Sequence, residues 1–566
     1  MNKNIKKEHF NDFIIPVMLI LCVMPFIIRY AEYDYGYGKY KWHSQDSIMQ
    51  DFYTYYRSIF FVTIVCITIA VLVFRMLLYT ESIKNVKVFI PLGIYCFFVL
   101  ISSILSVNVK AAFLGNIYYE GFFVITGYIV MAFYTYQIMS DEKDYKVIVK
   151  AILIMFTLIS AVGWIQIFRH DLLNVKSIQK LIMTKEQFAR YGGAIDNIFT
   201  GNNVFLSLYN PNYAAIFLIM FACLFMVFLL EAKTGKEKVL FAVYLADALV
   251  LCWFTYTRAA LVAFATVTVF FLICRKSNIR KALFVILGSV LVFIVLLCVD
   301  YINGGKYVNR IFDKKINTKL ESIETQKNGI KIKYGGKNYM LSMEDVKGGE
   351  IALPFSKKCY AESVNMNDKN LLLLYIEDYT LQFIKEEDGY YYYYTQWGKE
   401  DKILNVRSVD MHGKEYLGSG RMYIWSRTIP LLQRYIFIGS GPDTFAEVYP
   451  QNDYIGKMLY AKDTARIIEG AHNDYLMKWV QTGLVALIAL LVFYGSFVVK
   501  CFGYFRKEEI KTVKEKVGFG CFLGCLAYMV CSLFSDSTIY TSPIFYVFAG
   551  MALSAVENKK NDNKKR

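Results

Sequence analysis

The most constraining feature of the 566-residue sequence is a series of long apolar segments separated by charged connections. Hydrophobic residues make up 56% of the chain, charged residues 19%, and the mean hydropathy is +0.35. A helix of roughly 20 apolar residues crosses a bilayer, and we therefore predict an all-α polytopic membrane protein with about twelve transmembrane helices. The runs are Phe13–Ile28, Ile59–Leu78, Val88–Val107, Gly121–Ile138, Val147–Phe168, Tyr213–Leu230, Val239–Phe254, Ala259–Cys274, Ala282–Cys298, Tyr475–Val499, Val517–Phe534 and Ile539–Val556.

Basic residues predict how these helices are oriented. Short cytoplasmic connections carry an excess of Lys and Arg, and such residues concentrate in alternate connections and at both ends of the chain. Both termini are therefore expected in the cytoplasm, in a multi-pass protein of the cytoplasmic (inner) membrane. The net charge of +16 follows from this pattern, so it calls for no nucleic-acid partner.

The orientation divides the chain into three parts. Residues 1–300 hold helices one to nine, with outer loops at 29–58 and 169–212. Residues 301–474 form a large extracytoplasmic loop, and residues 475–566 hold helices ten to twelve and a basic cytoplasmic tail.

The large loop changes its pattern partway along. Between about 325 and 410 the apolar residues alternate, and Gly335–Asn338 and Asp388-Gly389 are hairpin signals. We predict a small β-rich insert there, in which Tyr390–Tyr394 alternates between a core face and a solvated face. Residues 418–474 return to a helical pattern and form the candidate catalytic part.

His472, in the stretch GAHNDYLMKW, lies just before the tenth apolar run. Asn473 or Asp474 is placed to cap the following helix. The positive end of the helix dipole disfavours imidazolium, and a neutral imidazole suits a general base. A nearby carboxylate, from Asp474 or Glu469, would instead favour the imidazolium form. An isolated histidine at a membrane surface more often has only an interfacial role.

Two arginines are expected at the same outer surface. Arg258 lies at the tip of the short connection TYTRAAL, and Arg421 lies on the apolar stripe of a helix that Ser419 is expected to cap. Two guanidinium groups suit a diphosphate, although Arg421 could instead bind backbone carbonyls or extend to water. With His472 as base, this set describes transfer from a diphosphate-activated lipid to a sugar hydroxyl.

Three polar residues lie where helices meet the outer surface. Glu120, Asn210 and Asn212 could line an acceptor groove, but helix capping and turn formation are the commoner roles for such residues.

Only Cys359 among twelve cysteines lies in the outer segments, and no zinc-type spacing, phosphate loop or dinucleotide fingerprint occurs. We therefore expect neither a metal nor a cofactor.

Several motifs occur in an order that resembles a known family. They are LGNIYYEG (114–121), AVGWIQIF (161–168), LYNPNYAAIFL (208–218), TYTRAAL (255–261), GRMYIWSRTIPLLQRYIFIGSGPDTF (420–445) and AHNDYL (471–476). Between about residues 88 and 490, leaving out the β-rich insert, the chain resembles the O-antigen ligase and O-antigen polymerase superfamily of bacterial membrane glycosyltransferases.

The resemblance implies a C-type glycosyltransferase-like fold that acts at the outer face of the membrane without a metal. The donor would be a glycan on undecaprenyl diphosphate, and the acceptor a glycan, lipid or protein. By match to the family's motifs, Arg258 and Arg421 would bind the diphosphate, His472 would activate the acceptor and Asn473 would support it. The expected reaction is direct displacement with inversion. The insert departs from the family's pattern and leaves the acceptor open.

Two other classes of protein fit part of the sequence. Twelve helices also describe secondary transporters, including a flippase of lipid-linked glycan, and Asp247 within the seventh run favours transport. The absence of an internal repeat argues against it. A non-catalytic scaffold that presents the β-rich insert is the third possibility.

Overall fold

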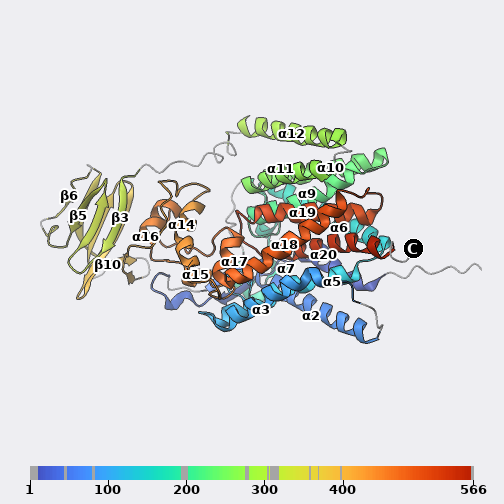
Figure 1. Ribbon diagram of the computed structural model, residues 1–566. Helices are drawn as coiled ribbons and strands as arrows, with labels where there is room; N and C mark the ends of the chain where they lie inside the picture. The colour runs from blue at the N-terminus through green and yellow to red at the C-terminus, as the bar shows by residue number, and fades with distance from the viewer. Residues whose placement is uncertain are drawn as a thin grey trace, which may run out of the picture.

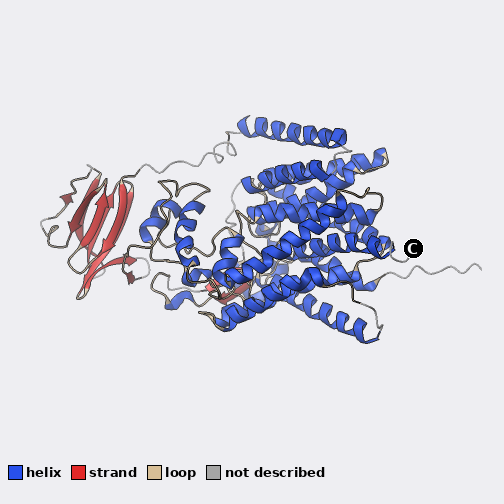
Figure 2. Cartoon of the chain, in the orientation of Figure 1, coloured by secondary structure: helices blue, strands red, loops and turns tan. Residues whose placement is uncertain are grey.

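A computed structural model of the chain describes residues 11–43, 48–78, 83–192, 202–274, 279–302, 305, 318–347, 349–355, 358–366, 369–394 and 398–562. A helical body occupies one end of the molecule and a β-rich module the other, with a smaller helical part between them (Figure 2). Figure 1 shows that the C-terminal end of the body lies away from the β-rich module.

Each of the twelve apolar runs contains helix. The helices of the body are α1 (Ile15–Met18) with η1 (Asp12–Ile14), η2 (Leu19–Val23) and η3 (Met24–Phe26), α2 (Tyr55–Leu78), η5 (Lys87–Phe89), α3 (Ile90–Ile104), α4 (Val109–Leu114), α5 (Phe122–Ile138), α6 (Glu142–Ile167), α9 (Pro211–Leu230), α10 (Gly235–Trp253), α11 (Arg258–Cys274), α12 (Ile279–Ile302), α17 (Asp474–Thr482), α18 (Leu484–Phe505), α19 (Val513–Cys531) and α20 (Ser542–Asp562).

Five described stretches are long and apolar enough to cross a membrane by length and composition. They are Tyr55–Leu77, Lys87–Ile104, Glu142–Ile167, Pro211–Leu230 and Leu484–Phe505. A membrane protein is thus supported, while the number of twelve crossings stays a prediction.

The tenth run departs from the expected single helix. Gly483, with φ of +91°, separates α17 from α18, and a Cβ at this position would lie 2.7 Å from the carbonyl oxygen of Phe437. The amide of Leu484 donates to the carbonyls of Tyr435 and Ile436. The chain after α14 therefore packs into the break, and the prediction of one continuous helix over Tyr475–Val499 is wrong.

α9 lies at the centre of the body, with 94% of its most apolar 18-residue window buried. It packs against α10 and α19. The close contact with α19 depends on Gly520, because a Cβ there would lie 2.6 Å from the side chain of Leu224. This central helix begins at the edge of the candidate site described below.

The β-rich module consists of two antiparallel sheets that enclose one core. The strands are β3 (Leu320–Thr325), β4 (Ile330–Tyr334), β5 (Lys337–Leu341), β6 (Ile351–Ala352), β7 (Cys359–Met366), β8 (Lys369–Ile376), β9 (Tyr379–Glu386), β10 (Gly389–Tyr394) and β11 (Lys399–Asp401). The first three form one sheet, and β6 to β11 pair in sequence order to form the other.

Both predicted hairpins of this module are confirmed, and the first has a two-residue turn, Gly335-Gly336. Tyr390 and Tyr392 lie in the core. The expectation of a solvated opposite face is wrong for Tyr393, which packs in a second cluster with Leu371 and Ile384.

The helical part between body and module contains α14 (Arg421–Leu432), α15 (Phe445–Val448), α16 (Tyr454–Gly456) and η8 (Lys457–Ala461). The residues Tyr454, Ile455, Met458 and Leu459 belong to the core of the β-rich module.

The outer segments nearer the N-terminus add a hairpin of β1 (Ala31–Asp34) and β2 (Ile48–Asp51), with the short helices η4 (Tyr37–Lys39), η6 (Leu172–Asn174), α7 (Lys176–Ile182) and α8 (Lys185–Tyr191).

Candidate functional site

His472 lies just before α17, and its imidazole is within ion-pair distance of the Asp536 carboxylate. Its Nδ1 is 2.9 Å from Oδ2 of Asp536, which comes from the segment between α19 and α20, 64 residues further along the chain. The His472 side chain is 36% exposed and the Asp536 side chain only 1%. A carboxylate at Nδ1 favours the imidazole form that carries its proton there, because that N–H can donate to the carboxylate. The Nε2 atom is then a free proton acceptor.

The local backbone brings the two side chains together. His472 has φ of +48°, a left-handed conformation that few non-glycine residues adopt. Gly470 leaves room for the carboxylate, since a Cβ there would lie 2.7 Å from Oδ2 of Asp536. Of the two predicted capping candidates, Asn473 caps α17: its Oδ1 accepts from the amide of Leu476, and its Nδ2 donates to the carbonyl of Leu533. Asn473 therefore ties the histidine segment to the Asp536 segment.

A buried polar cluster lies directly behind this pair. Ser537 donates to both carboxylate oxygens of Glu120 at 2.8 and 2.7 Å, and Tyr128 donates to the same carboxylate at 2.6 Å. Lys478 lies 3.5 Å from Asp474 and donates to Ser537 at 3.2 Å. Since Ser537 follows Asp536 in the chain, the cluster fixes the carboxylate that contacts His472.

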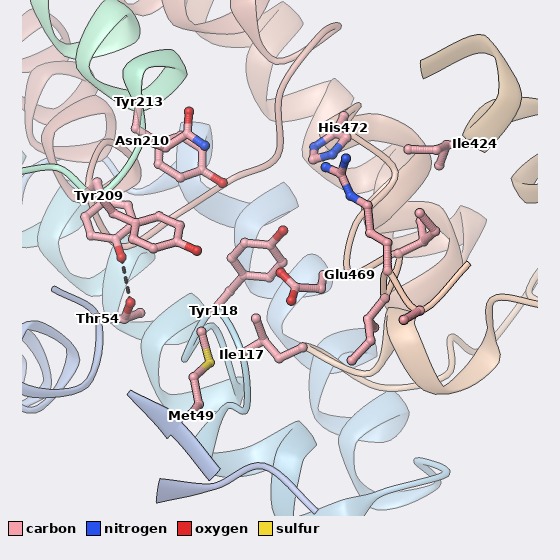
Figure 3. Close-up of a pocket in the computed structure, with 15 residues that line it drawn as sticks. Met49, Thr54, Ile117, Tyr118, Tyr209, Asn210, Tyr213, Ile424, Glu469 and His472 are labelled. Atoms are coloured by element: carbon pink, nitrogen blue, oxygen red, sulfur yellow. Dashed lines mark hydrogen bonds between the residues drawn. The ribbon is translucent and has the colours of Figure 1, made fainter. Parts of the chain in front are cut away.

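A pocket of about 410 Å³ opens beside His472. Figure 3 shows His472 and Glu469 on one side of it, Tyr209, Asn210 and Tyr213 on the other, and Tyr118 between them. Its remaining lining residues are Met49, Thr54, Ile117, Ile424, Ala465, Arg466, Ile467, Ile468 and Tyr540. Its size falls in the range of small-molecule sites.

The pocket combines aromatic rings with ionisable groups. Burial raises the pKa of the Glu469 carboxyl to about 7, although His472 and Arg466 partly oppose this shift. Tyr118 is held in place by the turn that precedes α15: the carboxylate of Asp443 accepts from the amides of Asn116 and Tyr118. Burial also raises the pKa of Asp443 to about 7.

The two predicted arginines meet at one turn. Nη2 of Arg258, at the first residue of α11, lies 3.3 Å from the hydroxyl of Ser419, and Nη1 of Arg421 donates to the carbonyl of Gly418 at 3.0 Å. Ser419 does not cap α14, contrary to expectation. The N-cap is Gly420 without a side-chain bond, and Ser419 has φ of +59° and contacts Arg258 instead.

The same turn is connected to the histidine through α14. Trp425, one helical turn after Arg421, donates from Nε1 to the carbonyl of Ala471 at 2.8 Å. Ile424 of the same helix lines the pocket, whereas the pocket's lining includes neither Arg258 nor Arg421. The arginine turn therefore lies outside the lining of the pocket and is joined to the His472 segment through Trp425.

The remaining predicted residues have mixed positions. Asn210 caps α9 and lines the pocket. Asn212 accepts from the hydroxyl of Thr257, next to Arg258, and is not among the lining residues. Glu120 belongs to the buried cluster behind the site. The acceptor-groove role of these three residues stays a prediction, and Asn210 is the one that faces the pocket.

Sequence reasoning missed Asp536 and the tyrosines that line the pocket. The signal for Asp536 was present as the polar stretch SDST between two apolar runs, which an outer turn at this point of the membrane would require. Tyr118, Tyr209 and Tyr540 carried no such signal, since aromatic residues are common at membrane surfaces. In the described part of the chain, no group of three or more His, Cys, Asp or Glu is placed to hold a metal ion.

The fold and the site define a class: a largely helical membrane protein with a histidine–carboxylate pair beside a pocket and a nearby pair of arginines. Residues 240–491 match a family model described as O-antigen ligase. The match supports the O-antigen ligase and O-antigen polymerase superfamily, which the motifs also resemble. No curated protein sequence matches the chain.

The matched range contains Arg258, Arg421 and His472 and ends before Asp536. The family implies a membrane protein with a glycosyltransferase-like role in glycan attachment, with a lipid-linked glycan and an acceptor as partners.

Proposed function

We propose that the protein transfers or polymerises a glycan from an undecaprenyl-diphosphate carrier onto a glycan or other surface acceptor. The reaction takes place at the outer face of the cytoplasmic membrane, with both termini of the chain in the cytoplasm. The observation that carries the proposal is the His472–Asp536 pair, which faces a pocket while two arginines meet at a neighbouring turn. The family match supports glycosyl transfer as the class of reaction.

In this mechanism, Nε2 of His472 takes the proton of an acceptor hydroxyl. The hydroxyl oxygen forms a bond to the anomeric carbon of the donor, and the bond from that carbon to the diphosphate oxygen breaks. The lipid diphosphate leaves with the electron pair, and the anomeric configuration is inverted. Base assistance of this kind contributes roughly 10²–10⁴-fold to a rate.

Arg258 and Arg421 have the chemistry to stabilise the leaving group. The diphosphate gains negative charge as the bond breaks, and preorganised cationic donors lower the energy of that state by roughly 3 kcal/mol each. The Gly418–Arg421 turn brings both side chains to one place. Asp536 keeps the imidazole in the orientation that leaves Nε2 unprotonated, and it stabilises the imidazolium that forms after proton transfer.

The transporter alternative loses its main support. Asp247 of α10 accepts from Nε1 of Trp164 of α6 at 2.8 Å, so it is a hydrogen-bonded acid between two helices. This contact accounts for a carboxylate at that depth without a transport role.

The experiment that tests the proposal uses the full-length protein, purified and reconstituted in lipid, with an undecaprenyl-diphosphate-linked oligosaccharide and without added metal. We expect longer or transferred glycan and one released lipid diphosphate per glycosidic bond formed, in the presence of EDTA. Release of lipid diphosphate without a new glycosidic bond would indicate a hydrolase, and an unchanged donor would reject the proposal.

A further inference from the structure

Glu469 is an ionisable residue of the pocket that the proposed reaction does not use. Glu469 precedes His472 by three residues, and its side chain extends toward Tyr118 inside the pocket (Figure 3). Among the residues that the structure describes, none donates a hydrogen bond to its carboxylate; its interactions are with the charges of His472, Arg466 and Asp536. Because this half-buried carboxylate lines the cavity, a ligand hydroxyl that enters the pocket can donate a hydrogen bond to it.

The opposite wall of the pocket is aromatic and uncharged. Tyr209, Tyr213 and Tyr540 lie there, and their rings stack in parallel: the centroids of Tyr209 and Tyr540 are 6.1 Å apart, and those of Tyr213 and Tyr540 5.3 Å. The hydroxyl of Tyr540 is bound to that of Thr54 at 2.6 Å, which fixes the wall. Flat aromatic faces opposite a few polar groups suit a ligand with one apolar face and hydroxyls at its edge.

We propose that this pocket is the acceptor subsite and that it holds an uncharged hexopyranose, with Glu469 accepting a hydrogen bond from a second hydroxyl of the same ring. This inference rests on the proposed function, because it places the attacked hydroxyl at His472. The sugar ring lies against the tyrosine wall, one hydroxyl meets Nε2 of His472, and a neighbouring hydroxyl meets the Glu469 carboxylate. Glu469 is thus a specificity-determining residue, and it takes no proton from the reacting hydroxyl.

The position of the arginines supports this division of the site. Arg258 and Arg421 lie at the Gly418–Arg421 turn and not in the pocket lining, so the groups proposed to bind the diphosphate do not occupy the space assigned to the acceptor sugar. Titratable groups face Glu469 from its own segment and from four other parts of the fold. Its own segment contributes Arg466 and His472. The other groups are Asp536 before α20, Tyr118 before α5, Tyr209 and Tyr213 at α9, and Tyr37 in the first outer loop.

The first test measures binding without catalysis. The full-length protein in lipid nanodiscs is titrated with methyl glycosides of glucose, galactose, mannose and N-acetylglucosamine, observed by ligand NMR. We expect at least one to bind the wild type, and Glu469→Ala to weaken it by roughly tenfold or more, as loss of a hydrogen bond to a charged group predicts. Glu386→Ala, which removes an exposed carboxylate on β9, is the matched control and should bind as the wild type does.

The second test uses monodeoxy derivatives of the glycoside that binds best. Removing the hydroxyl that meets Glu469 should weaken wild-type binding as much as Glu469→Ala does, and should have little further effect in that variant. The inference would be overturned if every deoxy sugar lost the same affinity for the wild type and for Glu469→Ala. It would also be overturned if Glu469→Ala bound the parent glycoside as the wild type does. In the transfer assay, Glu469→Ala should raise the acceptor KM far more than it lowers kcat. If the wild type transfers glycan and Glu469→Ala leaves the acceptor KM unchanged, the subsite alone is rejected. If the wild type transfers nothing, the proposed function is rejected.

Discussion

The β-rich module and the candidate site differ in how their contacts are spaced along the chain. In the module, β6 to β11 each pair with the next strand in sequence, so every register joins strands that are close along the chain. In the site, His472 contacts Asp536 at a separation of 64 residues, and Ser537 contacts Glu120 at a separation of 417. A local structure can be predicted from its own residues, while a site of distant segments exists only when the whole body has folded.

The two regions are nevertheless connected. The core of the module includes Tyr454 and Met458, and Tyr392 of β10 donates to Thr464, next to the pocket residue Ala465. The module is therefore packed against the segment that leads to Glu469 and His472. An insert with this arrangement can influence the site through the segment it contacts.

The largest expected effect lies in the distant contacts of the site. Asp536→Asn should lower kcat by roughly 10²–10⁴-fold, because an amide no longer fixes the imidazole with an unprotonated Nε2. Donor and acceptor KM should change little. Steady-state kinetics measures this, with Asp388→Asn at the exposed β9–β10 turn as control. Equal losses in the two variants would mean that the His472–Asp536 contact has no role in turnover.

The arginine turn should show the next largest effect. Arg258→Lys and Arg421→Lys keep the charge but lose the planar fork that matches a diphosphate, so each should raise donor KM by roughly tenfold or more and also lower kcat. Arg427→Lys should do less, since Arg427 lies on another face of α14 and pairs with Asp453 at 2.8 Å. Rates measured over a range of donor concentrations separate the change in donor KM from the change in kcat. If Arg427→Lys proved the most damaging of the three, the diphosphate role of the turn would be lost.

The pocket should show a pH-dependent effect of smaller size. Because burial raises the pKa of Glu469 to about 7, its carboxylate form increases as the pH rises from about 6 to about 8. Acceptor KM should therefore fall several-fold over this range, and Glu469→Gln should remove that dependence. An acceptor KM that keeps its pH dependence in Glu469→Gln would assign the titration to another group.

The smallest expected effect tests the contact between module and site. Tyr392→Phe removes the hydroxyl that donates to Thr464 at 3.0 Å, and should lower the free energy of unfolding by about 1 kcal/mol. Tyr391→Phe removes a hydroxyl that donates to the exposed Asp388, and should cost less. Thermal unfolding in detergent compares the two variants. A larger loss in Tyr391→Phe would argue that the module is not packed against the 454–464 segment.

The outcome of sequence reasoning follows the same division. Apolar runs and hairpin signals are local, and they predicted the helical body and both hairpins of the module. The break at Gly483 was not predicted, because it depends on residues 435–438 packing between α17 and α18. The family motifs predicted His472, Arg258 and Arg421, but Asp536 and the tyrosine wall required the arrangement in space of segments that are distant in sequence.

The most direct test of the central claim is turnover by purified His472→Ala in lipid, compared with the wild type and with His412→Ala, an exposed histidine near α14, as control. Translocation of the lipid-linked glycan is measured in the same vesicles. The account predicts that His472→Ala stays folded and inserted and binds donor normally, but loses transfer by roughly 10²-fold or more, while His412→Ala transfers at the wild-type rate. Wild-type transfer by His472→Ala would remove the histidine from the chemistry and contradict the account.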